Sequence, residues 1–407
     1  MIEKIFSKEE VNTGRQPEVD FMKAYCIIMM MITHTIDDLF IGYESNLPSF
    51  VINNVLAQSV GAHAFMISMG VGMVFTKKSS PKLYAERGLS ILVSGQVLNL
   101  FRYALFPGVL YVVKGGDEWA RAMMFLTYSV DILQFAGLFF LCMALFTKLR
   151  LKPLHIFIIA VLANAVGMLI GGKFSTGSYA VDQIIGFFVF TKTESYFPLI
   201  HWMVYPAFGI LFGDILKHVK DKRAFYRILF IPCSILMVVY YYIGINYEQP
   251  FFTVFNDWRT FCHPGLPDVI MQLFANTAIL SLCYFIAELL PEKVMKGAGY
   301  ISKNINRFYC IHIVLISFFA YIILEIMEFD YFTSAIPTYI FALCLIILTT
   351  VCVIIDDKYI NKYLREFTKG RRGAVLAAAV FLISIIVCVW AYPEIETFTN
   401  MWNDYTL

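Results

Sequence analysis

Residues 19–41 read VDFMKAYCIIMMMITHTIDDLFI, an apolar stretch with a histidine in its second half. Crossing the hydrocarbon layer of a bilayer takes about 20 apolar residues in a helix, so this segment predicts a membrane span. Ionisable groups are costly at membrane depth and are therefore candidates for function. His34 is such a group, and Asp37 and Asp38 follow it within about one helical turn.

The apolar character extends over the whole chain of 407 residues. Hydrophobic residues make up 59% and charged residues 15%, against roughly 45–50% and about 25% in ordinary soluble domains. The mean hydropathy is +0.68. This composition excludes a disordered chain, a nucleic-acid-binding module and an ordinary cytosolic enzyme. We expect an all-α, polytopic integral membrane protein that folds in contact with the lipid bilayer.

We count about eleven candidate spans, within a range of ten to twelve. They are residues 19–41, 51–76, 88–112, 123–147, 153–171, 196–216, 225–246, 266–290, 303–326, 333–355 and 373–391. A further apolar stretch near 181–191 is too short to cross and predicts a re-entrant or interfacial segment. The spans form one transmembrane domain over 19–391, between an N-terminal segment at 1–18 and a short tail at 392–407.

Lysine and arginine residues predict the orientation. With the N-terminus in the cytoplasm, all but six of the 32 basic residues fall in cytoplasmic segments, as the positive-inside rule requires. The N-terminal segment lacks the apolar stretch and cleavage site of a signal peptide, so the first span should direct insertion. We therefore expect a multi-pass plasma-membrane protein with an extracytoplasmic tail.

Four histidines fall at membrane depth. They are His34, His63, His201 and His312. A carboxylate beside an imidazole fixes its tautomer and raises its basicity, which makes His34 with Asp37 or Asp38 a candidate general base. Alternatively, the two aspartates cap the outer end of the helix, His63 bonds to a neighbouring helix, and His201 lies at the membrane interface.

Three further polar residues stand in or near apolar stretches: Arg102, Asp131 and Gln134. Gln134 would bond another helix or line a cavity. Membrane-depth His, Asp and Gln also build proton relays, so a secondary transporter or proton-coupled channel is the alternative to an enzyme. The sequence contains none of the soluble catalytic motifs GxSxG, GxxxxGK[ST], HExxH or GxGxxG, and no zinc spacing, so we expect no metal.

Several motifs follow one another in order along the chain. Lys23 precedes His34 by eleven positions, and a late span carries Lys303, Asn304, Tyr309 and His312 in the order basic-Asn-x-x-x-x-Tyr-x-x-His. Between them lie GAHAFMISMGVGMVF (61–75), AERGLSILVSGQVLNLF (85–101) and FPLIHWMVYPAFGILFGDIL (197–216). This ordered set resembles the transmembrane acyltransferase superfamily, which includes the acyltransferase-3 family and the heparan-alpha-glucosaminide N-acetyltransferase group.

The resemblance implies an acyl-CoA-dependent O- or N-acetyltransferase. Such an enzyme moves an acetyl group from cytoplasmic acetyl-CoA to a hydroxyl or amine of an extracytoplasmic acceptor, here a cell-envelope carbohydrate or glycolipid. His34 would deprotonate the acceptor or transiently carry the acetyl group. The further catalytic residues would be Asp37, Asp38 and His312.

The resemblance also suggests which residues bind the two substrates. Cations on the cytoplasmic side would bind the donor phosphates, and the donor-binding set is Lys23, Arg87, Lys303, Asn304 and Arg307. The set expected to position the acceptor or stabilise the oxyanion is His63, Gln134, His201 and Tyr309. Helix faces of small residues pack within or between chains, so a homo-oligomer stays open.

Overall fold

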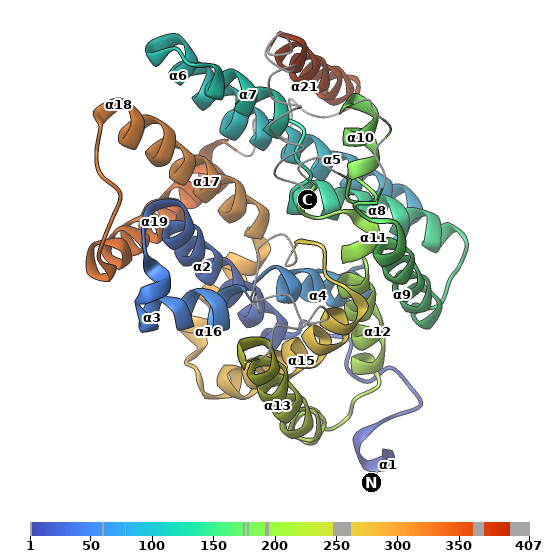
Figure 1. Cartoon of the computed structure of the whole chain (residues 1–407). Coiled ribbons are helices and arrows are strands. Elements are labelled where there is room, and N and C mark those ends of the chain that lie inside the picture. The colour runs from blue at the N-terminus through green and yellow to red at the C-terminus, as the bar shows by residue number, and fades with distance from the viewer. Residues whose placement is uncertain are drawn as a thin grey trace.

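The computed structural model of the chain is built of helices, and the part that it describes contains no β-sheet. The described residues are 2–58, 61–77, 79–173, 176, 179–191, 195–246, 262–360 and 370–390. The predicted all-α class is therefore confirmed, and Figure 1 shows the helices packed side by side. The predicted tail at 392–407 lies outside the described residues.

In the described residues, eight helical runs are long and apolar enough to cross a membrane. They are α2 (Pro17–Leu39), α5–η3–α6 (Pro81–Asn99, Leu100–Leu105, Phe106–Lys114), α9 (Pro153–Ile170), α11–α12 (Leu199–Trp202, Val204–Lys217), α13 (Lys222–Asn246), α15 (Leu266–Leu289), α17–η4–α18 (Ile305–Phe318, Phe319–Leu324, Glu325–Met327) and α19–η5 (Ala335–Ile355, Asp356–Ile360). Each coincides with a predicted span.

The count of eleven spans is not confirmed. The three remaining predicted spans coincide with shorter apolar helices, which lie in α4 (Gly61–Val74), α8 (Ile132–Lys148) and α21 (Gly370–Trp390). Other short helices are α1 (Ile2–Ile5), η1 (Tyr43–Ser45), α3 (Leu47–Phe50), η2 (Val51–Gln58), α7 (Asp117–Leu126), α10 (Tyr179–Gly186) and α16 (Glu292–Lys303). Helix α10 covers the first half of the stretch predicted to be re-entrant or interfacial.

The predicted span 123–147 is not one continuous helix, because the chain breaks between α7 and α8. Asp131 stands at this break and caps α8, since its Oδ1 accepts a hydrogen bond from the Ile132 N–H at 2.6 Å. Its Oδ2 accepts a second hydrogen bond from the Tyr309 hydroxyl at 2.8 Å. The Asp131 side chain favours the start of a new helix at this position over continuation of α7. The average hydropathy of the segment does not detect such a break, because it does not depend on capping.

Helix α16 lies in a segment that the sequence assigned to a cytoplasmic loop. The helix is amphipathic and buries Ala298, Gly299 and Ser302 against the start of α2. The Ser302 hydroxyl donates a hydrogen bond to Asp20 at 2.6 Å. A half-polar helix carries no long apolar run, which is why counting apolar residues overlooks it.

Helix α2 is the element around which the others pack. It contacts α4, α15, α16, α17 and α19, and Figure 1 shows it enclosed between α19, α16 and α4. Its first turn is held by Glu18, which is 1% exposed, forms an ion pair with Lys222 at 2.5 Å and accepts a hydrogen bond from the Tyr226 hydroxyl at 2.9 Å. These contacts fix α2 to α13 and so fix the positions of the polar residues that α2 carries.

Helices α4 and α12 approach each other so closely that their backbones touch. Gly70 faces the Pro206 carbonyl and Gly209 faces the Ile67 carbonyl, and at neither position is there room for a Cβ atom. Small residues allow this close approach. In lipid no hydrophobic driving force acts between helices, so the van der Waals contacts made at such close approach stabilise the pair instead. Of these two helices, α4 contacts α2 directly.

Candidate active site

Two of the membrane-depth histidines meet across 278 positions of sequence. His34 projects from α2 and His312 from α17, with His34 Nδ1 at 3.3 Å from His312 Nε2 and the ring centroids 5.3 Å apart. His312 is fully buried, whereas His34 is half-buried. The structure thus brings together two residues that the sequence predicted to be catalytic.

The hydrogen bonds of the pair fix the tautomer of both rings. His312 Nδ1 lies 2.9 Å from the Phe308 carbonyl oxygen, which can only accept, so Nδ1 carries the proton. In the neutral ring Nε2 of His312 is then an acceptor, and Nδ1 of His34 donates to it. The remaining nitrogen of His34, Nε2, keeps a free lone pair. The hydrogen bonds therefore determine which nitrogen of His34 is open to accept a proton from a ligand.

The pair is braced by a second hydrogen-bonded group on the same side of α17. Tyr309 packs edge-on against His312 with ring centroids 5.5 Å apart, and its hydroxyl bonds to Asp131. Arg102 Nη1 lies 3.8 Å from Asp131 Oδ2. The Arg102 charge is close enough to act on both histidines. The start of α8 is thereby fixed to the helix that carries His312.

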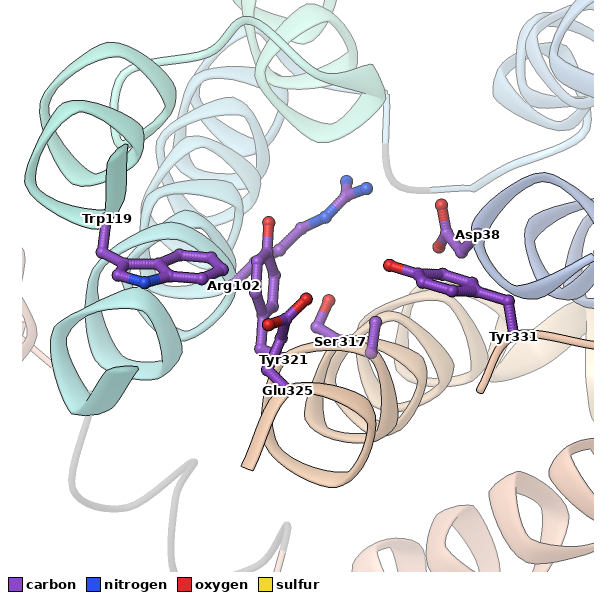
Figure 2. Close-up of a pocket in the computed structure, with 8 residues that line it drawn as sticks. Asp38, Arg102, Trp119, Ser317, Tyr321, Glu325 and Tyr331 are labelled. Carbon is purple, nitrogen blue, oxygen red and sulfur yellow. The ribbon is translucent and has the colours of Figure 1, made fainter. Parts of the chain in front are cut away.

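A cavity of about 270 Å³ opens at the end of α2 that follows His34. Its lining is polar and aromatic and consists of Asp38, Arg102, Trp119, Ser317, Ala320, Tyr321, Glu325 and Tyr331. Asp38 stands four residues after His34, so the two share one side of α2. Figure 2 shows Asp38 and Arg102 entering from different helices, with Tyr331 beside Asp38 and Trp119 beyond Arg102. His34 itself is not among the lining residues, so a ligand bound at Asp38 would lie about one helical turn from it.

Two walls of the cavity are π-helical. Arg102 lies in η3 and Tyr321 in η4, which interrupt the α-helical runs of α5–α6 and α17–α18. A π-helical turn shifts the register of the residues that follow it, and such turns are rare and occur frequently at functional sites. Here they place side chains of two long helices into one cavity.

Asp37 and Asp38 point to different neighbours. Asp37 is exposed and accepts a hydrogen bond from Asn53 Nδ2 in η2 at 2.7 Å. Asp38 lines the cavity and interacts electrostatically with Arg102. In the described residues the hydrogen-bond partner of His34 is His312 rather than either aspartate.

Three of the residues predicted to contact the acceptor lie in other interfaces. His63 on α4 stacks on Trp202 of α11 at 4.8 Å and packs edge-on against Tyr205 of α12 at 4.7 Å. Gln134 on α8 packs against Gly95 on α5. His201 lies near Phe190 and His263, with centroids 5.7 and 6.0 Å away.

The predicted donor-binding residues lie toward the opposite end of α2. The Lys23 ammonium stands over Gly72 of α4, where a Cβ would come within 3.2 Å of it. Lys23 and His34 lie on the same α2 helix, about 16 Å apart along its axis, and eleven residues are close to three full turns.

The other predicted donor-binding residues are surface groups or are already paired. Arg307 forms ion pairs with Asp356 at 3.1 Å and Asp357 at 2.5 Å and donates to Asn304 at 2.9 Å. Lys303 is exposed and Arg87 half-buried. No group of three or more His, Cys, Asp and Glu side chains in the described part of the chain is arranged to hold a metal ion.

Sequence reasoning gave no role to most of the cavity. Arg102 and Asp131 carried a signal, since both are charged residues in or near apolar stretches. The other lining residues Trp119, Tyr321, Glu325 and Tyr331 carried none, because no motif or charge pattern in the sequence singles them out.

Comparison with known families gives one match. The family model described as heparan-alpha-glucosaminide N-acetyltransferase, catalytic, matches residues 15–244, which is more than half of the chain. The match contains His34, Asp38 and Arg102, and it ends before α17 and His312. No curated protein and no solved structure matches the chain.

Proposed function

The chain belongs to the heparan-alpha-glucosaminide N-acetyltransferase catalytic family and is therefore a membrane acetyltransferase, and from that premise we propose that His34 is its general base. The observation that supports this proposal most directly is the chain of hydrogen bonds that runs from the Phe308 carbonyl through His312 to His34. It leaves the lone pair on His34 Nε2, on the helix whose next turn lines the cavity. We propose acetyl-CoA as the donor and a hydroxyl or amine of a carbohydrate as the acceptor.

In this proposal transfer is direct. The acceptor heteroatom attacks the thioester carbonyl carbon while His34 Nε2 takes the proton from that heteroatom. Collapse of the tetrahedral intermediate breaks the carbon–sulfur bond, and the proton passes from His34 to the departing sulfur. The products are the acetylated acceptor and CoA with a free thiol. His312 holds His34 in the correct tautomer throughout.

The donor is proposed to enter from the end of α2 that bears Lys23. The adenine nucleotide phosphates would lie among Lys303, Arg87 and Asn304 at the bundle end, while the pantetheine arm follows α2 past Lys23 to His34. Arg307 would exchange one of its two carboxylate partners for a phosphate. In this proposal the donor binds from the cytoplasmic side, and the positive-inside distribution of the basic residues supports that side.

The acceptor is proposed to enter from the opposite, extracytoplasmic side, through the cavity that Asp38 and Arg102 line. Aromatic side chains together with carboxylates suit a sugar ring, because rings pack on aromatic faces while hydroxyls bond to the carboxylates. The protein would then acetylate a cell-envelope carbohydrate or glycolipid at the plasma membrane, with its N-terminus in the cytoplasm.

The test is acetyl transfer by the purified full-length protein in detergent. Radiolabelled acetyl-CoA is supplied with glucosamine, glucose or an envelope polysaccharide extract, and both labelled product and released CoA thiol are measured. We expect acceptor-dependent release of CoA that His34→Gln abolishes while binding of CoA, measured by calorimetry, persists. A folded wild-type protein that neither binds CoA nor releases its thiol would refute the proposal and favour a transporter.

A further inference from the structure

We propose that Arg102 is an anion-binding residue of the acceptor cavity and that it holds a carboxylate, sulfate or phosphate carried by the acceptor. This inference rests on the proposed function and adds a requirement on the acceptor's charge. It arises from the partners that the guanidinium has, and from those that it lacks, in the described residues.

The guanidinium of Arg102 has more donors than partners. It carries five N–H donors in a planar fork, and its side chain is 23% exposed, toward the cavity. Its nearest contacts are the Asp131 carboxylate at 3.8 Å, beyond hydrogen-bond distance, and the Tyr103 ring at 4.8 Å, and the Asp38 carboxylate also acts on its charge. Among the described residues no acceptor atom forms a hydrogen bond with it. Asp131 and Asp38 balance its charge, while the N–H donors on its exposed side face the cavity and are available to a ligand.

Asp131 is already committed elsewhere. Its two oxygens accept hydrogen bonds from the Ile132 N–H at 2.6 Å and the Tyr309 hydroxyl at 2.8 Å. Both are shorter than its contact with Arg102. The carboxylate therefore serves to cap α8 and hold α17, and it leaves the donors of Arg102 available to the cavity.

Of the charged groups that line the cavity, Glu325 is paired with Lys114 at 3.1 Å. The two remaining charged groups of the cavity, Arg102 and Asp38, act on each other electrostatically, but no hydrogen bond joins them in the described residues. Asp38 is the remaining carboxylate of the cavity, and it lies on α2 four residues after His34. A ligand with its reacting amine or hydroxyl beside Asp38 and an anionic group beside Arg102 would satisfy both. The planar fork of Arg binds such oxyanions with two parallel hydrogen bonds.

The size of the cavity limits what lies inside it. Its volume of about 270 Å³ is near the lower end of the roughly 300–1,000 Å³ typical of small-molecule pockets. This fits one ring with its substituents rather than a length of polymer. The anionic group is therefore expected on the acetylated unit itself or on the unit joined to it.

The experiment compares acceptors that differ by one anionic group, in the full-length protein with acetyl-CoA. The series is glucosamine against glucosamine 6-sulfate, glucosamine 6-phosphate and muramic acid, which also separates the three kinds of anion. The variants are Arg102→Gln and Arg102→Lys. The matched control is Arg223→Gln, which removes an arginine with a similarly long ion pair, 3.9 Å to Glu288, at the other end of the bundle.

We expect wild type to prefer at least one anionic acceptor over glucosamine. Arg102→Gln should raise the KM for that acceptor by about 10- to 100-fold more than it raises the KM for glucosamine. Arg102→Lys should recover part of the preference, because it restores the charge without the fork. Arg223→Gln should leave the preference unchanged.

Two results would overturn the inference while leaving the proposed function standing. One is a wild-type enzyme that acetylates glucosamine as well as every anionic acceptor. The other is an equal loss of kcat for all acceptors in Arg102→Gln, which would place Arg102 at the reaction's oxyanion. If wild type releases no CoA with any acceptor, the proposed function itself fails. If Arg102→Gln does not fold, the thermal midpoint of the wild-type protein is measured with each sugar in the absence of donor. Equal stabilisation by glucosamine and by the anionic sugars would then refute the inference.

Discussion

His34 and His63 carry the same sequence signal and lie in opposite kinds of surroundings. Both are histidines at membrane depth in an early span. His63 is 0% exposed, with its ring covered by Trp202 and Tyr205. His34 is half-buried, is hydrogen-bonded through one nitrogen to His312, and stands one turn from a cavity. Depth in the membrane marks a costly residue, whereas the groups around its ring decide whether it can exchange a proton with a ligand.

The largest effect should come from replacing His34. His34→Gln keeps a polar side chain of similar reach but removes the titratable nitrogen, so kcat should fall by about 100- to 10,000-fold. The measurement is the steady-state rate of CoA thiol release, with the thermal midpoint as the check on folding. If the variant keeps more than a tenth of wild-type kcat, the contrast between the two histidines is wrong.

The next largest effect should come from His312. In His312→Ala the Nδ1 of His34 loses its acceptor, so the ring is free to adopt the tautomer with its lone pair turned away from the substrate. We expect kcat to fall by about 10- to 100-fold with the KM for acetyl-CoA nearly unchanged. Kinetics at saturating acceptor separate the two parameters. An unchanged kcat would show that His34 is oriented by another group.

The sequence could predict α2 closely but could not predict what His34 touches. The span predicted at 19–41 is a helix at Pro17–Leu39. The prediction is close because a helix that crosses the bilayer needs an apolar run of a defined length, which is visible in the sequence. His34 and His312 were both candidates through the motifs that contain them. Their contact joins positions 278 residues apart, and no local pattern encodes such a distance.

The parts of the site that the sequence missed share a physical reason. The break before α8 depends on Asp131, whose cap is completed by Tyr309 from a helix 178 positions later. The cavity wall depends on two π-helical turns and on Trp119 and Tyr331, which no periodicity marks. Hydropathy reports which segments lie in lipid, whereas helix breaks and cavity walls are set by tertiary contacts.

A smaller effect should come from Asp131, and two substitutions separate its roles. Asp131→Ala loses the cap of α8 and should lower the free energy of unfolding by about 1 kcal/mol, whereas Asp131→Asn keeps a good capping side chain and should cost less. Because Tyr309 is three residues from His312, Asp131→Ala should also lower kcat by about three- to tenfold. Denaturant unfolding in detergent and CoA release measure the two effects. Equal stability of both variants would show that the cap contributes nothing.

The smallest effect on kcat should come from replacing His63. His63→Phe keeps an aromatic ring between Trp202 and Tyr205, where centroid distances of 4.8 and 4.7 Å show close packing. Ring contacts of this kind contribute about 0.5–1.5 kcal/mol, and Phe retains most of them, so kcat should stay within about threefold of wild type. The same assay that reports the loss in His34→Gln measures it. If His63→Phe folds with a wild-type thermal midpoint but loses activity as His34→Gln does, His63 takes part in the chemistry, and aromatic contacts around a ring are then not a sign of a structural role.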